Sequence, residues 1–159
     1  MTVGTMMPFD RLIKAMDAWA LRHPDENVLA QTGEGSWVPT HMPYREMFSP
    51  DEFRRHCSNC NVIVSHVGMG TVIMAADLQR PLVAVPRRQH LNEANSDHQV
   101  ATAAWLRDRP GVSIIDSELD LEGAIERMAA TRGAATFGSE SQSRLCARIA
   151  QFLWAAVDQ

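Results

Sequence analysis

Residues 62–85 contain two short apolar runs separated by a glycine-rich turn and one short amphipathic stretch. The first run, residues 62–64, reads Val-Ile-Val, and the second, residues 82–85, reads Leu-Val-Ala-Val. Runs of this kind are typical of strands that are buried on both faces. Residues 71–78 fit a single short helix between them, so the unit is strand–helix–strand and its two strands run parallel. The sequence therefore predicts a parallel sheet, which needs helices on both faces.

The rest of the chain repeats this alternation. We expect further strands at residues 2–4, 28–31 and 112–115, with helices near residues 9–20, 49–60, 97–107 and 119–132. Prolines within residues 37–48 predict an edge strand or a loop, and Ser49 followed by Pro50 predicts a capped helix start. A last amphipathic helix carries one apolar stripe, made of Leu145, Ile149, Phe152, Leu153, Ala156 and Val157.

The predicted fold class is therefore α/β, a Rossmann-like parallel sheet with helices on both faces, in a single domain over residues 1–159. Apolar residues make up 45% of the chain and charged residues 21%, which is typical of a globular domain. A net charge of −4 offers no basic surface for nucleic acid, so we expect no such partner. No apolar run approaches the roughly 20 residues that span a bilayer. The first residues do not resemble a signal peptide, so we expect a cytoplasmic chain.

Cys57 and Cys60 form a Cys-x-x-Cys pair, which can mark a redox site or half of a zinc site. A redox pair of this type opens a helix, whereas this one closes a predicted helix. Zinc needs about four ligands, and only His56 and His66 lie near in the sequence. We therefore expect no metal and no redox cofactor.

The segment from Val64 to Thr71 places a glycine-rich turn between a buried strand and a helix. Free N–H groups at a helix start attract anions, and glycine lets a phosphate approach the backbone, so Gly68 and Gly70 can mark a phosphate site. They can equally serve tight strand-to-helix packing. Thr71 can donate to a phosphate or cap the helix. His66 can donate to a phosphate, act as an acid or base, or be a structural residue.

A second polar cluster follows the strand at residues 82–85. Loops at the carboxyl ends of parallel strands line ligand crevices, so Asp97 and Gln99 can bind sugar hydroxyls. From the residues alone, ordinary helix capping and solvation are the favoured explanation for both. Arg87 and Arg88 in the preceding loop can pair with a phosphate or a sugar carboxylate, or simply lie in solvent.

Five segments occur together and in order, and they are Val3-Gly4-Thr5, Pro8-Phe9-Asp10-Arg11-Leu12, Ser65-His66-Val67-Gly68-Met69-Gly70-Thr71, Pro81-Leu82-Val83 and Asn95-Ser96-Asp97-His98-Gln99. In combination they resemble the C-terminal domains of glycosyltransferase family 28, and especially the single-domain PssE-type subunits of bacterial exopolysaccharide glycosyltransferases. The resemblance covers nearly the whole chain. It implies the C-terminal half of a GT-B fold.

This resemblance implies that the donor is a UDP-sugar and that no cofactor or metal is needed. The implied donor-binding residues are Gly4, Thr5, His66, Gly68, Met69, Gly70, Thr71, Arg87, Arg88, Asp97, His98 and Gln99. The glycine loop would lie by the diphosphate, and the Asp-His-Gln segment would reach the sugar. His66 is the one candidate catalytic residue in this chain, although its place beside the leaving group favours a general base from elsewhere.

The resemblance also implies partners. A membrane-anchored PssD-like subunit would bind a lipid-linked acceptor glycan, so the chain would work at the inner face of the membrane. It would be the UDP-sugar-binding catalytic subunit of a two-component inverting glycosyltransferase in exopolysaccharide biosynthesis. The alternative is a non-catalytic accessory subunit that stabilises such a partner. A NAD-type oxidoreductase is disfavoured because the full glycine fingerprint is absent.

Two features depart from the family pattern. Met74 stands where relatives carry an acidic residue that holds the ribose hydroxyls. The strand at residues 2–4 lacks the apolar residues that usually precede it, so either the start lies further upstream or that edge of the sheet is weak. A weak edge would favour association of the chain with itself as a homo-oligomer. Trp154 lies off the apolar stripe of its helix and suggests a docking surface.

Overall fold

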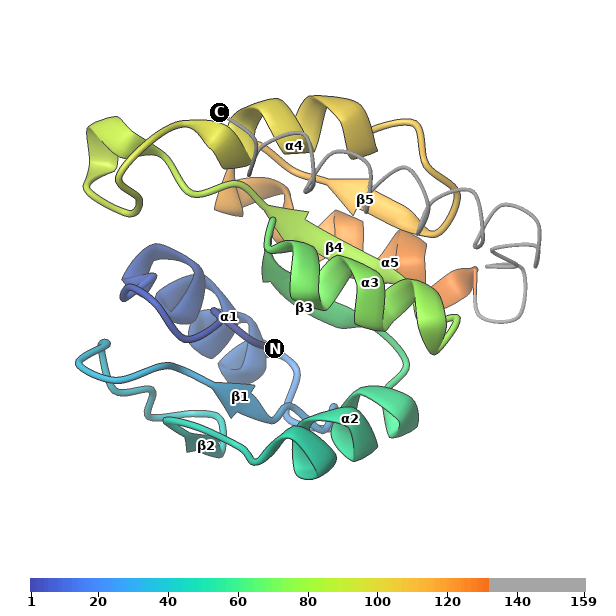
Figure 1. Cartoon of the computed structure of the whole chain (residues 1–159). Helices are drawn as coiled ribbons and strands as arrows, with labels where there is room; N and C mark the ends of the chain where they lie inside the picture. Colours follow the sequence, from blue (N-terminus) through green and yellow to red (C-terminus); the bar gives the residue numbers. More distant parts are fainter. Residues whose placement is uncertain (132–159) are drawn as a thin grey trace.

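The computed structural model describes residues 1–131, and it contains one parallel sheet. Strands β3 (Ile63–His66), β4 (Leu82–Val85) and β5 (Val112–Ile114) pair in that order, and β1 (Ala30–Gln31) pairs with β2 (Tyr44–Arg45). Thr2 forms parallel bridges to both Gln31 and Ser65, so it joins the two groups of strands. The order is therefore β2, β1, the Thr2 segment, β3, β4, β5 (Figure 1).

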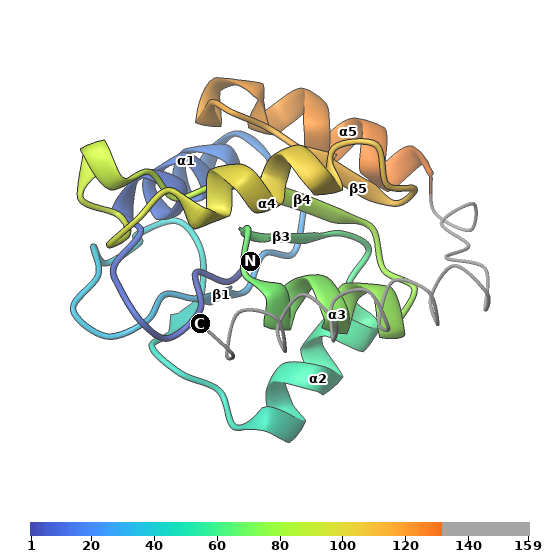
Figure 2. The ribbon, with the colours of Figure 1, turned by 45° about the horizontal axis from the view of Figure 1, so that its top comes forward.

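Helices cover both faces of this sheet, which confirms the predicted fold class. One face carries α1 (Asp10–Arg22) and α5 (Leu121–Ala130), and the other carries α2 (Pro50–Asn59), α3 (Met69–Asp77) and α4 (His98–Leu106). Figure 2 shows α1 and α5 on one side of the strands and α2 and α3 on the other. Two short 3₁₀ helices, η1 (Gln89–Leu91) and η2 (Glu118–Asp120), lie in the loops after β4 and β5.

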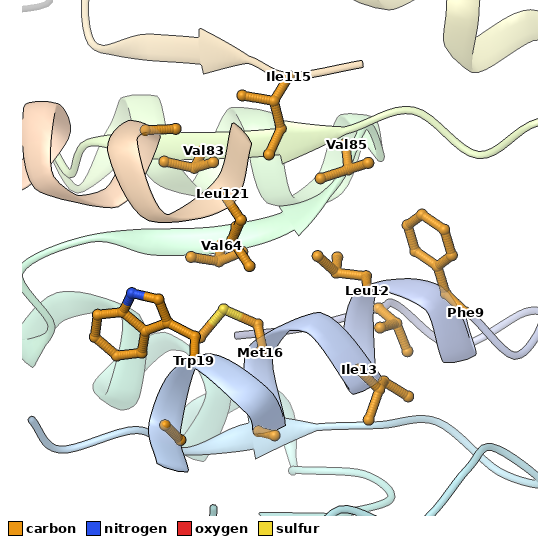
Figure 3. Packing of buried hydrophobic residues seen from close by; sticks show 14 of the residues in the cluster. Phe9, Leu12, Ile13, Met16, Trp19, Val64, Val83, Val85, Ile115 and Leu121 are labelled. Atoms are coloured by element: carbon orange, nitrogen blue, oxygen red, sulfur yellow. The ribbon is translucent and has the colours of Figure 1, made fainter. Parts of the chain in front are cut away.

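The two-residue period of β4 divides the core between the two faces. Val83 and Val85 pack with the apolar face of α1 and with α5, as the close view in Figure 3 shows, while Leu82 and Ala84 pack with α3 and α4. All four side chains are buried, as a strand covered on both faces requires. This alternation fixes the register of β4, because a slip by one residue would exchange the two sets.

Local signals set several element boundaries as predicted. Ser49 caps α2 in a full capping box with Glu52, and Pro50 occupies the first helical position. The proline-containing stretch at residues 37–48 is irregular apart from the edge strand β2. The predicted last helix and Trp154 lie outside the described residues.

The expectation of a weak sheet edge at residues 2–4 is wrong. Thr2 lies in the interior of the sheet, where its N–H donates to the carbonyl of Val64 at 2.9 Å and the N–H of Val3 donates to that of Gln31 at 3.1 Å. The first segment is short but has a neighbour on each side. Among residues 1–131, the strands at the edges of the sheet are β2 and β5.

Candidate functional site

The loops that follow the strands meet at the carboxyl edge of the sheet. Because every pairing is parallel, residues 4–8, 32–36, 67–68 and 86–97 emerge at one end. In Figure 1 the first, second and last of these loops extend to the left of the molecule. Ligands of open parallel sheets bind at this edge. The sequence-predicted residues lie in or directly beside these loops.

The imidazole of His66 lies between two of the predicted glycines. A Cβ atom at Gly4 would lie 2.7 Å from Cε1 of His66, and one at Gly68 would lie 2.6 Å from the same atom and closer still to Nε2. Gly4 also has a φ of +78°, which L side chains rarely adopt. These two glycines therefore make room for the ring of His66. Gly68 therefore serves close packing against His66, and its role at a phosphate site stays a prediction.

His66 is neutral in the folded chain. Burial, followed by the charges of Arg87 and His98, lowers its pKa from 6.5 to about 4. Its Nδ1 is buried and has no hydrogen-bond partner among the described residues. A buried N–H without an acceptor is costlier than a buried lone pair, so the proton belongs on Nε2, beside Gly68. At neutral pH His66 can thus donate a hydrogen bond from Nε2, but it has no proton to release as a general acid.

The start of α3 presents free backbone donors next to this ring. The N–H groups of Thr71 and Val72 both donate to the carbonyl of Gly68, whereas those of Met69 and Gly70 have no acceptor within residues 1–131. Gly68, at the N-cap, makes no side-chain cap. Gly70 is exposed, and a Cβ added there would meet nothing within 4 Å. Two free amides and the positive end of the helix thus lie at an open position, with Nε2 of His66 beside the adjacent Gly68, and this arrangement suits an anion.

Arg87 does not point into this open position. Its side chain is 4% exposed, and its guanidinium donates to the backbone carbonyls of four residues. The acceptors and distances are Val3 at 2.7 Å, Met7 at 2.5 Å, Pro8 at 2.7 Å and Glu93 at 2.9 Å. Both terminal nitrogens of Arg87 therefore donate to backbone carbonyls, and not to the open position where a phosphate or sugar carboxylate was expected.

The remaining predicted residues lie on the loop after β4 and the start of α4. Arg88 contacts Asp116, donating from Nη2 to its carbonyl at 3.1 Å. Asp97 accepts from the N–H of Gln89 through Oδ1 at 2.8 Å. His98 and Gln99 also have intramolecular partners, which are the hydroxyl of Ser96 at 2.8 Å and the N–H of Arg87 at 3.1 Å. Gln99 is buried by this arrangement, while Asp97 and His98 are exposed.

A hollow of about 270 Å³ adjoins the loop of residues 4–8. It is lined by Thr5, Met6, Met7, Gly33, Glu34 and Gly35. Thr5 is among the residues that the sequence predicts for donor binding, whereas Gly33, Glu34 and Gly35 are not. The signal was present in the spacing, because two glycines directly after a strand often mark positive φ, and Gly33 and Gly35 have φ of +73° and +69°.

Two classes of feature are missing from residues 1–131. No three His, Cys, Asp or Glu side chains there gather as metal ligands. Within the same residues, no helix combines the length and the apolar character that crossing a bilayer requires. Burial raises the pKa of Cys57 to about 11, with the charge of Cys60 adding to the effect, so this thiol is not primed for redox chemistry.

The comparison with protein families decides the identity of the fold. The model of the Glycosyltransferase family 28 C-terminal domain matches residues 2–132, which is most of the chain. This chain belongs to glycosyltransferase family 28. The family 28 domain also resembles a solved structure, the spinosyn forosaminyltransferase SpnP, with a TM-score of 0.53 and 20% sequence identity. The match covers 89% of this chain and 37% of SpnP. Together with the match to a C-terminal domain model, this likeness gives the fold as the C-terminal half of a GT-B glycosyltransferase. Among curated sequences no match is found.

Proposed function

We propose that this family 28 domain is the UDP-sugar-binding catalytic subunit of a two-component inverting glycosyltransferase, which acts on a lipid-linked glycan in exopolysaccharide biosynthesis. The observation that carries the proposal is the grouping of the free N–H groups of Met69 and Gly70 with Nε2 of neutral His66 at the carboxyl edge of the sheet. The choice of UDP comes from the resemblance to PssE-type subunits. No metal or other cofactor is part of the proposal.

In the proposed reaction the acceptor hydroxyl attacks the anomeric carbon and UDP leaves. The bond from the sugar to the diphosphate breaks, and negative charge accumulates on the diphosphate oxygens. The start of α3 and Nε2 of His66 are fixed before the reaction, so they stabilise that charge without reorganising. His66 thus contributes as a hydrogen-bond donor. The proton of the acceptor hydroxyl passes to a base on the partner subunit.

Sugar recognition is assigned to the loop after β4 and the start of α4. Asp97 uses Oδ1 for the N–H of Gln89, which leaves Oδ2 for a sugar hydroxyl. Gln99 uses Oε1 for the N–H of Arg87, which leaves its amide nitrogen as a donor. Arg88 and His98 lie on the same loop and helix start, and Thr5 lines the hollow between the loops at residues 5–7 and 33–35.

The partner supplies what one half of a GT-B fold lacks. The domain spans 37% of the length of SpnP, so a second, acceptor-binding half is needed for a complete enzyme of that architecture. We assign this half to a membrane-anchored PssD-like subunit that brings the lipid-linked acceptor glycan. The family 28 domain would then work at the inner face of the membrane through its partner, with no nucleic-acid ligand.

Met74 favours a second candidate function. Its sulfur accepts a hydrogen bond from Nη1 of Arg54 at 3.6 Å, and the residue packs towards α2. Methionine cannot hold ribose hydroxyls as an acidic side chain does. A chain that had lost donor binding would act as a non-catalytic accessory subunit for the same partner.

Calorimetric titration with UDP separates these two functions. Gly70→Asp adds a carboxylate at the open position, and Gly70→Asn adds a neutral group of the same shape. An acidic residue in the first turn suits a helix, so folding tolerates the Asp variant. We expect saturable binding to the wild type and the Asn variant and none to the Asp variant. No binding to the wild type, alone or with its partner subunit, would favour the accessory role, and equal loss in both variants would reject the anion site at Gly70.

A further inference from the structure

Arg87 holds together parts of the site that lie far apart in the sequence. Its four acceptors belong to two loops, the one at residues 3–8 and the one after β4. The guanidinium also lies over the ring of Phe9, 4.8 Å from its centroid. A guanidinium offers five N–H donors in a fixed plane, so it can fix several carbonyls at once. The loop at residues 3–8 is thus wrapped around one buried cation.

This loop determines where His66 can sit. Gly4 lies within the loop and contacts the imidazole ring, while Thr5, Met6 and Met7 line the adjoining hollow. A shift of the loop would therefore move the ring and reshape the hollow together. The backbone N–H of Arg87 adds a third link, because it donates to Oε1 of Gln99 at 3.1 Å and so orients that side chain.

The loop after β4 is itself anchored to α1. The carboxylate of Glu93 accepts from Nε and Nη2 of Arg11 at 2.7 and 2.9 Å, and it also accepts from the N–H of Arg88 at 3.0 Å. Arg11 further donates to Glu118 at 2.9 Å. The carbonyl of Glu93 that Arg87 contacts is thereby held in place. Arg87 thus has one anchored acceptor, from which its guanidinium can hold the loop at residues 3–8.

We propose that Arg87 is a positioning residue of the donor site. It holds the loop at residues 3–8 against His66 and orients Gln99, and it does not contact the donor. The role depends on the planar fork of the guanidinium rather than on charge. Lysine keeps the charge but cannot reach four carbonyls from one plane. A direct phosphate ligand would behave in the opposite way, since lysine is a competent phosphate binder. The inference rests on the proposed donor site, but part of its test needs no donor.

The first part of the test uses NMR on the free protein. Arg87→Lys and Arg87→Met are compared with Arg22→Lys, an exposed arginine on α1 that pairs with Glu122. We expect both Arg87 variants to shift the signals of His66 and of the Met69 and Gly70 amides, and the control to leave them in place. We also expect the pKa of His66 to rise in the Met variant, because a nearby positive charge is removed. A folded Lys variant with unchanged signals at these positions would overturn the proposal.

The second part adds UDP. In the wild type, UDP should shift the Met69 and Gly70 amides but not the Arg87 side-chain signals, whereas a direct ligand would shift them strongly. We expect Arg87→Lys and Arg87→Met to weaken UDP binding by a similar factor, at least about tenfold, as loss of one charge-assisted hydrogen bond would do. Near-wild-type affinity in the Lys variant would overturn the proposal. Absence of UDP binding to the wild type would count against the proposed function alone, since the donor-free shifts still test the positioning role.

If Arg87→Met does not fold, the Lys variant and the wild-type titration decide the question. In the assembled two-subunit enzyme, the same variants separate KM from kcat. A displaced loop alters the geometry of the reacting groups, so we expect kcat to fall as well as KM to rise in the Lys variant. An effect on KM alone would indicate a simple loss of donor binding and would contradict the positioning role.

Discussion

Lowering the pH from 7 to 5 should cost the fold about 2 kcal/mol through one side chain, His66. Burial, with smaller effects from the charges of Arg87 and His98, lowers its pKa from 6.5 to about 4 in the folded chain. As the pH falls, the unfolded chain therefore takes up a proton before the folded chain does. The stability that neutral His66 contributes is complete above pH 6.5 and is lost between pH 6.5 and about 4. At about 1.4 kcal/mol for each pKa unit, the full loss is about 3 kcal/mol.

Urea unfolding at pH 7 and pH 5 measures this loss directly. The matched variant is His66→Gln, which has no imidazole to protonate and leaves the other histidines in place. We expect the free energy of unfolding of the wild type to fall by about 2 kcal/mol more than that of the variant between these two pH values. Carboxylates contribute equally to both proteins and cancel in the difference. Parallel pH dependence would refute the assignment of His66 as a buried, neutral ring.

Two further predictions test contacts that hold the fold. Gly68→Ala should destabilise the chain by about 1–3 kcal/mol, because the new methyl overlaps the His66 ring. Gly70→Ala should instead stabilise it by up to about 1 kcal/mol, since alanine is the better helix former and the space is open. Thermal unfolding that ranks the two variants the other way would contradict this packing. Asp17→Ala should cost about 2–4 kcal/mol in urea unfolding, because this buried carboxylate accepts from the N–H and ring nitrogen of His41 at 2.7 and 2.9 Å. Asp17→Asn keeps the first of these bonds and should lose less, and equal losses would point to some other cause.

Local sequence signals predicted much of the fold. The capping box at Ser49 and the apolar runs around Val64 and Val83 depend on residues close in the sequence, and they gave the right elements within a few positions. The order of the strands depends on contacts between distant residues. The interior place of Thr2 follows from its bridges to Gln31 and Ser65, and no pattern within residues 1–8 indicates it.

The same limit applies to the candidate site. Glycines between a buried strand and a helix predicted the meeting of Gly68 with the start of α3. Arg87 and Arg88 are adjacent and chemically alike, so nothing in the local pattern distinguishes their roles. The structure buries Arg87 among carbonyls of the first loop and leaves Arg88 beside Asp116, because the path of the chain brings residues 3–8 against β4. Such convergence of backbone carbonyls has no signature in side-chain chemistry.

The interior position of Thr2 affects the order in which the chain can fold during synthesis. Thr2 pairs with both Gln31 and Ser65 in the interior of the sheet, yet Ser65 is made much later than Gln31. Residues 1–31 allow Thr2 to pair with Gln31 only, and the pairing with Ser65 forms after β3 has been translated. Synthesis at about 5–20 residues per second is far slower than helix formation, so α1 would remain with its apolar stripe uncovered until the later strands are made. A nascent chain halted before residue 65 would therefore expose an apolar surface of α1 to which a chaperone can bind.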